Sequence, residues 1–235
     1  MKQNAKAACA DSIKQRVLSM ELAPGQLLDE TALSDEFGIS RTPLREIIQR
    51  LCGEGFLSVH ANRGAKVASM DLSTMRHFFQ SAPMIYASVS RLAAEQATDE
   101  QISKLQLIQD AYRNAIMQGK AQETAMHNHR FHELIGDMAG SPYLKPSLHR
   151  LLIDHTRIGQ VCYRSRGMED DEKIETAANQ HDGLIEAMSQ NRAAEAVKLT
   201  LEHWELSRHE IEQFVTPDPL PFELADMEGE LNHAV

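Results

Sequence analysis

The segment HNHRFH, residues 127–132, places three histidines and one asparagine within six positions. Imidazole nitrogens are good ligands for zinc, nickel, copper and iron. In a helix, Asn128 and His132 lie one turn apart on the same face, as two ligands of one ion must. His129 lies about 100° round the helix from Asn128, so we expect His127 and His129 mainly to decorate the helix surface. The segment therefore offers one pair of metal ligands, and further ligands must come from other elements.

A second stretch, SRTPLRE at residues 40–46, has the features of a helix that binds DNA. Ser40 is a favourable N-cap, and Pro43 falls in the first turn, where its missing N–H costs nothing. Arg41 and Arg45 are four residues apart and share one face, opposite an apolar stripe. Arginine at a helix N-terminus can bind phosphate or a guanine edge. A solvated basic face would look the same, so the neighbouring elements must decide.

These elements form a helix-turn-helix followed by a hairpin. Helices are predicted at residues 7–21, 29–38 and 39–55, with Pro-Gly and Gly at the breaks. Two short strands, 56–60 and 65–69, flank a tight turn. The residues at the hairpin tip could enter the adjoining groove as a wing; they are Asn62, Arg63 and Gly64. With the hairpin beside it, SRTPLRE is better interpreted as a DNA-binding helix than as a solvated basic face.

The rest of the chain has a helical pattern. Long helices are predicted at about residues 72–97, 99–118, 121–139, 143–166, 172–190 and 192–214. The fold class is therefore mainly α, with an N-terminal winged helix-turn-helix and a C-terminal all-helical bundle. We expect a DNA-binding domain at 7–70, an effector- and metal-binding domain at 72–215, and a loose acidic tail at 216–235, which has three prolines.

Charge and composition agree with this division. The chain has 235 residues and a net charge of −10. Residues 1–70 hold nine basic and eight acidic side chains, so the acidic excess belongs to the second part and does not argue against a DNA-binding face. The three cysteines are scattered, as in a reducing compartment. No apolar run approaches the ~18–20 residues of a membrane span, so we expect a cytoplasmic protein without a membrane partner.

Residues 28–67 closely resemble the winged-helix domain of the GntR family of bacterial transcriptional regulators. The resemblance is carried by the Pro-Gly before the second helix, the SRTPLRE core and the RGAKV wing, within a match from about Ile13 to Val67. It implies contact with operator DNA through the recognition helix and the wing. The implied contacts are Thr31, Ser40, Arg41, Thr42, Arg45, Asn62, Arg63 and Gly64.

The helical remainder resembles the FCD ligand-binding domain of the FadR-like branch of that family. Metal-binding members have an Asp four residues before a His, and two further histidines on later helices. The resemblance assigns these positions to Asn128, His132, His181 and His203, and implies a divalent transition metal, zinc or nickel foremost. The departure is Asn128, because an amide oxygen is neutral and a weaker donor than a carboxylate.

A second departure concerns the effector, the small molecule to which such regulators respond. Many relatives have an arginine on the first FCD helix that pairs with an effector carboxylate, and here Ala82 takes that position, followed by Pro83. We therefore consider substitutes elsewhere: Tyr86, Arg130 and Arg157.

The prediction is a homodimeric transcriptional regulator, a repressor, that binds operator double-stranded DNA and a small-molecule effector, possibly a carboxylate, beside the metal. Two half-sites of an operator need two copies of the winged helix. Two alternatives remain. In one, the sensor is metal-free and the histidines contact the effector directly. In the other, remote alternative, the bundle is a metal-dependent hydrolase, although HELIG (132–136) lacks the second His of HExxH. We expect no enzyme activity.

Overall fold

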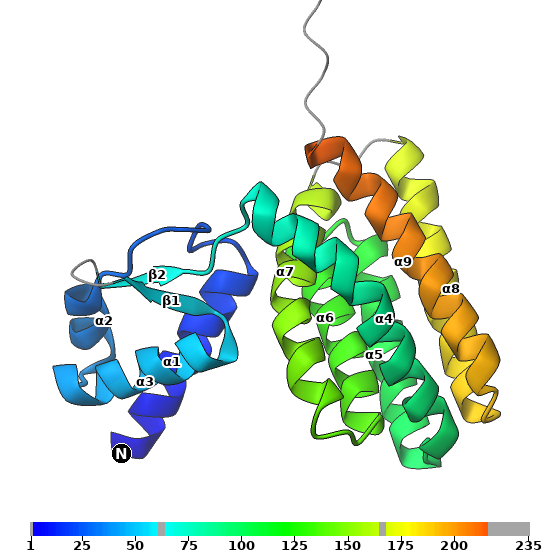
Figure 1. Cartoon of the computed structure of the whole chain (residues 1–235), viewed down its shortest axis with the longest axis horizontal. Helices are drawn as coiled ribbons and strands as arrows, with labels where there is room; N and C mark the ends of the chain where they lie inside the picture. Colours follow the sequence, from blue (N-terminus) through cyan, green and yellow to red (C-terminus); the bar gives the residue numbers. More distant parts are fainter. Residues whose placement is uncertain (1, 61–63, 165–167, 216–235) are drawn as a thin grey trace, which may run out of the picture.

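The computed structural model describes residues 2–60, 64–164 and 168–215, and it shows two modules joined by a short linker (Figure 1). The N-terminal module consists of α1 (Lys2–Leu18), α2 (Glu30–Phe37), α3 (Arg41–Glu54), β1 (Leu57–His60) and β2 (Gly64–Val67). The second module consists of α4 (Leu72–Gln96), α5 (Asp99–Met117), α6 (Ala121–Met138), α7 (Leu144–Arg164), α8 (Met168–Ser189) and α9 (Ala193–Val215). The predicted fold class is confirmed. The tail expected at 216–235 lies outside the described residues.

The two helices of the helix-turn-helix are bounded by local signals. Asp29 caps α2, because its Oδ1 accepts from the backbone N–H of Thr31 at 3.0 Å and of Ala32 at 2.9 Å. Gly38 ends α2 in the left-handed conformation, with φ of 60°. Ser40 occupies the N-cap position of α3 with an extended backbone, but its side chain makes no capping hydrogen bond. The hydroxyl therefore stays available at an exposed helix start.

The hairpin closes the front module. β1 and β2 pair antiparallel from Leu57 opposite Val67 to His60 opposite Gly64, so the second strand starts and ends earlier than the predicted 65–69. Ala65 and Val67 are buried against the stripe of α3, which consists of Leu44, Ile47, Ile48 and Leu51. This period-two burial fixes which face of the hairpin meets the helices.

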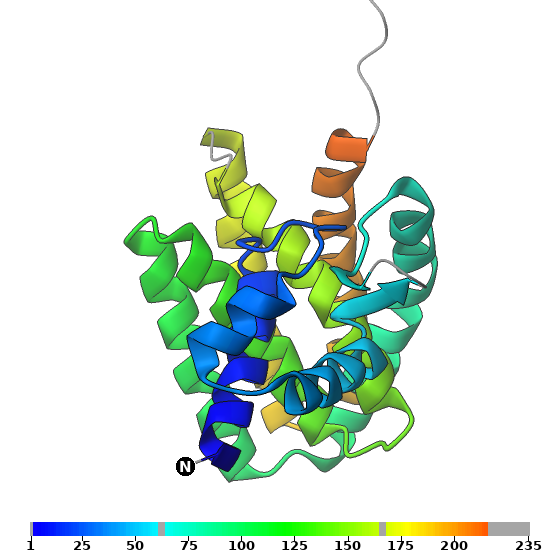
Figure 2. The same ribbon diagram turned by 90° about the vertical axis from the view of Figure 1, so that its left-hand side faces the viewer.

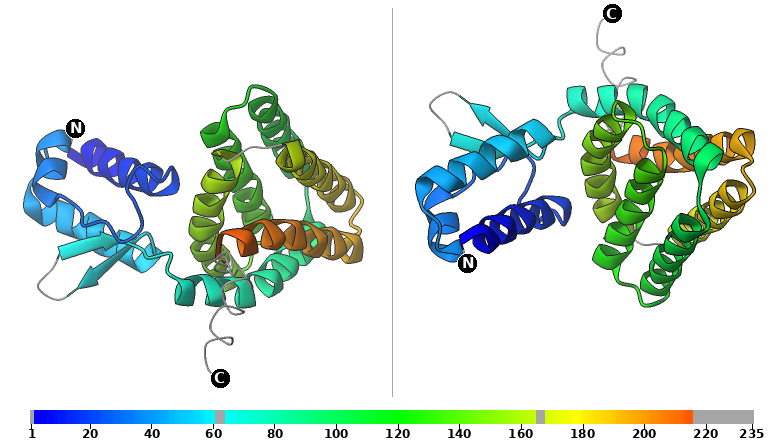
Figure 3. Two further views of the ribbon diagram at one scale, coloured as in Figure 1. Left: turned by 90° about the horizontal axis from the view of Figure 1, so that it is seen from above. Right: turned by 90° about the horizontal axis from the view of Figure 1, so that it is seen from below.

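The second module is a bundle of six helices around one apolar core. α4 packs against α9, and α6 packs against both α5 and α7. Seen from above and below, the helices surround the core and the winged module stands to one side (Figure 3). α4 continues as one helix through Pro83. Among the described residues, no helix is both long and apolar enough to cross a membrane.

Helix α7 joins the bundle to the winged module. Figure 2 shows that module in front of the bundle. The side chain of Ile153 on α7 belongs to the apolar core of α1 and α3. Arg157 donates to the carbonyl of Ala68 in the linker at 2.7 Å, and Arg164 donates to the carbonyl of Ser19 after α1 at 2.9 Å. The orientation of the winged module is therefore set largely by one helix of the bundle.

Candidate metal centre and DNA-binding surface

Three histidines from three helices meet inside the bundle. His132 on α6, His181 on α8 and His203 on α9 each offer one ring nitrogen, and these atoms lie within 4.8 Å of one another. Their side chains are 4%, 0% and 6% exposed. Atoms this close in a dry interior can share one ion. The three positions that the resemblance selected from eleven histidines are thus brought together.

Asn128 lies one turn before His132 on α6 and is buried as well, at 4% exposure. Its Oδ1 has no hydrogen-bond partner, and neither has Nε2 of His132 or of His181. Buried polar atoms are nearly always paired, because desolvating one without a partner costs about 1–3 kcal/mol. A metal ion would pair these orphaned donor atoms, so the residues present fit the group that the FCD resemblance implies.

Glutamine side chains orient two of the imidazoles. Nδ1 of His181 lies 3.1 Å from Oε1 of Gln109, and Nδ1 of His203 lies 3.0 Å from Oε1 of Gln180. Gln109 is held in this orientation because its Nε2 donates to the carbonyl of Ala178 at 2.8 Å. An amide oxygen only accepts, so each Nδ1 carries the proton, and Nε2 of His181, which has no hydrogen-bond partner, keeps its lone pair for an ion.

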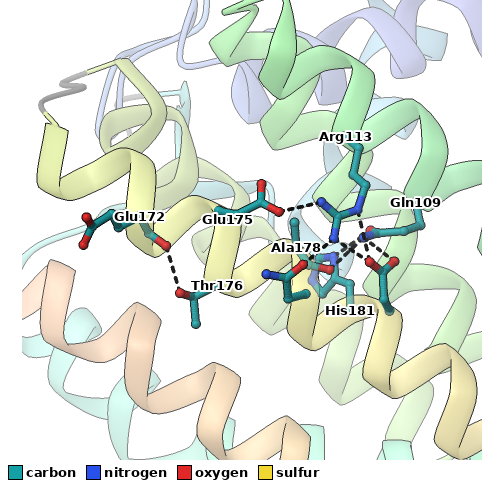
Figure 4. Close-up of polar contacts among 9 residues, drawn as sticks. Gln109, Arg113, Glu172, Glu175, Thr176, Ala178 and His181 are labelled. Carbon is teal, nitrogen blue, oxygen red and sulfur yellow. Dashed lines mark hydrogen bonds and ion pairs between the residues drawn. The ribbon is translucent and has the colours of Figure 1, made fainter.

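A charged network supports Gln109 from behind (Figure 4). Its Nε2 also donates to Oδ1 of Asp182 at 2.9 Å. Arg113 donates to Oδ2 of Asp182 through Nε at 3.1 Å and to Glu175 at 3.0 Å. The carboxylate of Asp182 is therefore balanced by a guanidinium and is separated from His181 by the neutral amide.

The imidazoles are neutral at physiological pH. Burial, followed by the neighbouring histidines, holds the pKa of His132 and of His181 well below the usual value. Burial lowers the pKa of His203 to about 4. Neutral imidazole is the form that binds metal, so protons do not compete for these nitrogens near pH 7.

A fourth histidine, His155 on α7, belongs to the same cluster. Its ring centre lies 5.1 Å from that of His132, and its Nδ1 lies 2.7 Å from the hydroxyl of Tyr86. Sequence reasoning did not select His155 as part of the site. No spacing signal could have found it, because only the packing of α7 against α4 and α6 brings it there.

The expectation for His129 needs correction. We expected it to decorate the helix, but it is half-buried, and its Nδ1 lies 2.7 Å from Oγ1 of Thr156 on α7. His127 is half-buried and lies outside the histidine cluster. The reason is that α7 covers more of α6 than the apolar stripe of α6 alone indicates.

Two small cavities adjoin the cluster, and only one of the three effector candidates lines either of them. Tyr86 lines one of them with His132 and His155. Arg130 and Arg157 line neither. Arg130 is exposed and borders a cleft of about 680 Å³ between the two modules. Arg157 is fully buried, pairs with Asp154 and holds the linker carbonyl. Of the three, only Tyr86 lies where a ligand beside the histidines would be.

The winged module presents its predicted DNA contacts to solvent. The side chains on α2 and α3 and at the turn before α3 are exposed: Thr31, Ser40, Arg41, Thr42 and Arg45. Within the described residues, neither Arg41 nor Arg45 has an ion pair, so both guanidinium groups are available. Gly64 is exposed and begins β2 with φ of 74°, which favours glycine. Asn62 and Arg63 lie outside the described residues.

A winged helix-turn-helix whose exposed face carries two arginines, joined to a helical bundle with a buried polar cluster, defines a two-domain DNA-binding regulator. The bacterial regulatory proteins of the gntR family match residues 5–67, and the FCD domain matches residues 84–206. The chain therefore belongs to the GntR family of bacterial transcriptional regulators and carries an FCD domain.

Relatives agree with this membership. The chain is 24% identical over 195 residues to YdhC of Bacillus subtilis, an uncharacterized HTH-type transcriptional regulator, covering 83% of this chain and 85% of YdhC. It is 26% identical over 127 residues to the HTH-type transcriptional repressor RspR of Escherichia coli, covering 54% and 56%. These relatives are transcriptional regulators and not enzymes, which sets the hydrolase alternative aside.

Solved structures share the fold. The E. coli protein McbR/YncC superposes with a TM-score of 0.77 at 19% identity, covering 90% of this chain and 99% of McbR. A GntR transcriptional regulator from Rhodococcus superposes with a TM-score of 0.60 at 15% identity, covering 86% and 96%. At these identities the likeness shows a shared fold.

Proposed function

We propose that this regulator is a homodimeric repressor whose affinity for operator DNA is set by a small carboxylate bound beside a divalent transition metal, zinc or nickel. The observation that carries the proposal is the set of buried donor atoms without partners on Asn128, His132 and His181. When bound, such an ion supplies open coordination positions that attract an oxygen ligand.

The place for the effector is supported by a cavity of about 40 Å³ between α6, α7, α8 and α9. Asn128, His155 and His203 border it on the side of the cluster, and Lys173 borders it from α8. Within the described part of the chain, Lys173 has no ion pair. Two imidazole rings and one amide side chain, together with one unpaired ammonium, favour a small anionic group such as a carboxylate.

Helix α7 provides the physical connection from effector to DNA. It contributes His155 to the cluster, Ile153 to the core of the winged module and Arg157 to the linker. If α7 can take two positions, each goes with its own orientation of the winged module. A ligand that binds one of these positions better shifts the population toward the orientation that goes with it. Operator affinity then changes, because a dimer must match two half-sites about one helical turn apart.

Repression as the sign of control is supported by similarity alone. RspR of E. coli is a transcriptional repressor, and so is GlaR of E. coli, which is 24% identical over 195 residues, 81% of this chain. A reporter gene behind the native operator would test it: deleting the regulator should raise expression, and a fall in expression would make the protein an activator.

The experiment that tests the metal is elemental analysis of untagged protein, purified without chelator, together with its melting temperature. Wild type should hold about one equivalent of transition metal per chain, as expected for a single histidine site with an open coordination position. His181→Ala should lose the metal and melt lower than wild type. His77→Ala, which removes an exposed histidine on α4, is the matched control and should have the metal content and the melting temperature of wild type.

The metal-free sensor is the second candidate, and the observation that favours it is Asn128 in place of a carboxylate. The same unpartnered nitrogens could then accept hydrogen bonds from an effector. Wild-type protein that takes up neither zinc nor nickel on incubation would select this candidate.

A further inference from the structure

The cleft of about 680 Å³ between the two modules lies apart from the histidine cluster. Its walls come from α1 and α3 on one side and from α6 and α7 on the other, and none of the described residues that line it is His132, His181 or His203. Its volume falls in the range of about 300–1,000 Å³ that is typical of small-molecule sites. The cavity beside the histidine cluster holds about 40 Å³, so a molecule larger than a carboxylate head fits the cleft and not that cavity.

The side chains that border the cleft are more basic than acidic, although the whole chain has a net charge of −10. Two carboxylates border it, Glu54 and Glu133, against four basic side chains, which are Lys14, Arg130, Lys145 and Arg150. All of the basic side chains except Arg130 pair with a carboxylate of the protein, at N–O distances of 2.5 to 3.2 Å. Arg130 is exposed and has no ion pair within the described residues. An anion is therefore attracted to the cleft, and the guanidinium of Arg130 can bind it.

A second polar group at the cleft also lacks a partner. Nε2 of His149 is buried without a hydrogen-bond partner, and the residue borders the cleft from α7. Buried polar atoms are nearly always paired, and an imidazole N–H can donate to an anion. His149 and Arg130 thus give two helices of the bundle a donor for the same anionic group.

The cleft also has an apolar part. Leu18 and Phe56 border it from the winged module, and Met126 and Leu152 border it from the bundle. An apolar group placed against these side chains leaves water, which favours binding, and the flexible methionine can adapt to its shape. A ligand that satisfies both parts of the cleft has an anionic head and an apolar body.

A ligand in the cleft would contact the end of the recognition helix. Gly53 and Glu54 border the cleft from the last turn of α3. Gly55 ends α3, and a β-carbon at this residue would overlap the side chain of Arg150, so α7 approaches the end of α3 closely. A ligand that touches both sides of this contact binds one orientation of the winged module better than another.

We propose that the cleft between the modules is a second ligand site, which binds an organic anion with an apolar body and couples that binding to the orientation of the recognition helix. The anionic head is a carboxylate or a phosphate, and Arg130 binds it. Leu18, Phe56 and Met126 contact the apolar body. The site is separate from the effector position beside the histidines, and it does not depend on the proposed metal.

The test uses 8-anilinonaphthalene-1-sulfonate as the probe, an anion with apolar rings whose fluorescence rises when it leaves water. Full-length wild type should bind it at a single site, with the same affinity before and after treatment with EDTA. Operator DNA should change this affinity at least about fivefold, the lower end of typical coupling between sites. Competition with hexanoate and with hexyl phosphate distinguishes the two head groups, and displacement by either one supports the proposal.

Two variants separate the anionic head from the apolar body. Arg130→Gln should weaken binding of the sulfonate at least about tenfold, or about 1.4 kcal/mol, and should leave the affinity for N-phenyl-1-naphthylamine, which has the same rings without the sulfonate, unchanged. Gly53→Leu should weaken both probes, because a β-carbon at Gly53 meets no atom within 4 Å and the new side chain takes up space in the cleft. Arg76→Gln on α4 and Asn114→Leu on α5 make the same changes at exposed positions and should behave as wild type.

Several results would overturn the inference, and most of them come from wild type, so they do not depend on the folding of a variant. Loss of sulfonate binding after EDTA treatment would place the anion at the histidine cluster instead. Failure of both hexanoate and hexyl phosphate to displace the probe would remove the proposed ligand class. An affinity that operator DNA does not change would remove the coupling. Equal affinity of wild type and Arg130→Gln for the sulfonate would remove the site itself.

Discussion

The contact between Arg157, Asp154 and the linker allows a sharp test of how the two modules are held together. The Arg157 side chain is fully buried, Asp154 is 5% exposed, and the two form an ion pair. Arg157 also donates to the carbonyl of Ala68 at 2.7 Å. Arg157→Met keeps most of the side-chain volume while removing the charge and the donors.

The expected loss follows from what the substitution leaves behind. Removing one partner of a buried ion pair costs about 3–5 kcal/mol, because the other charge stays in the interior. Arg150 still reaches Asp154 at 3.2 Å, although it is 42% exposed and screened by solvent. We therefore expect the free energy of unfolding to fall by about 3 kcal/mol, at the lower end of that range.

Urea denaturation of the metal-free protein, followed by circular dichroism, measures this loss. The double variant Asp154→Leu/Arg157→Met removes both charges and should recover all but about 1 kcal/mol, which reflects the lost donor to Ala68. Arg150→Met is the control and should cost less than about 1 kcal/mol, as an exposed partner does.

The reasoning would be refuted if Arg157→Met unfolded within about 0.5 kcal/mol of wild type, the usual spread of neutral surface substitutions. It would also be refuted if the double variant were as unstable as the single one. Loss of effector response at wild-type stability would instead restore Arg157 to the role of effector contact that the sequence first suggested.

Two further predictions concern the DNA-binding surface of the winged module and the metal site. Arg45→Ala should weaken specific operator binding by about 1–3 kcal/mol in a fluorescence anisotropy titration. If the guanidinium of Arg45 does not contact the operator, operator affinity will stay unchanged. Arg91→Ala, on the exposed face of α4, is the control. Gln109→Leu should weaken metal binding about 10–100-fold, because His181 loses the acceptor that fixes its tautomer, while Gln106→Leu on the exposed face of the same helix should leave it unchanged. Equal metal affinity of Gln109→Leu and wild type, in a competition titration with a chromophoric chelator, would contradict the role assigned to the amide.

The local features of this protein follow from its sequence, because their causes are local. Caps, glycines and apolar spacing placed the helix ends within a few residues, except at the starts of α1 and α8, which begin earlier than predicted. The helical period alone put Arg41 and Arg45 opposite the buried stripe, and it put Asn128 and His132 on one face.

The surroundings of the candidate site were decided by tertiary packing. The period of a helix says which side chains share a face, but it does not say which other helix that face will meet or at what height. His155, Gln109 and Gln180 therefore carried no signal in the sequence, and they reach the cluster because α5, α7 and α8 pack against it. Arg157 illustrates the same limit, since a cation suited to a ligand became buried at the linker once α7 was docked on the winged module.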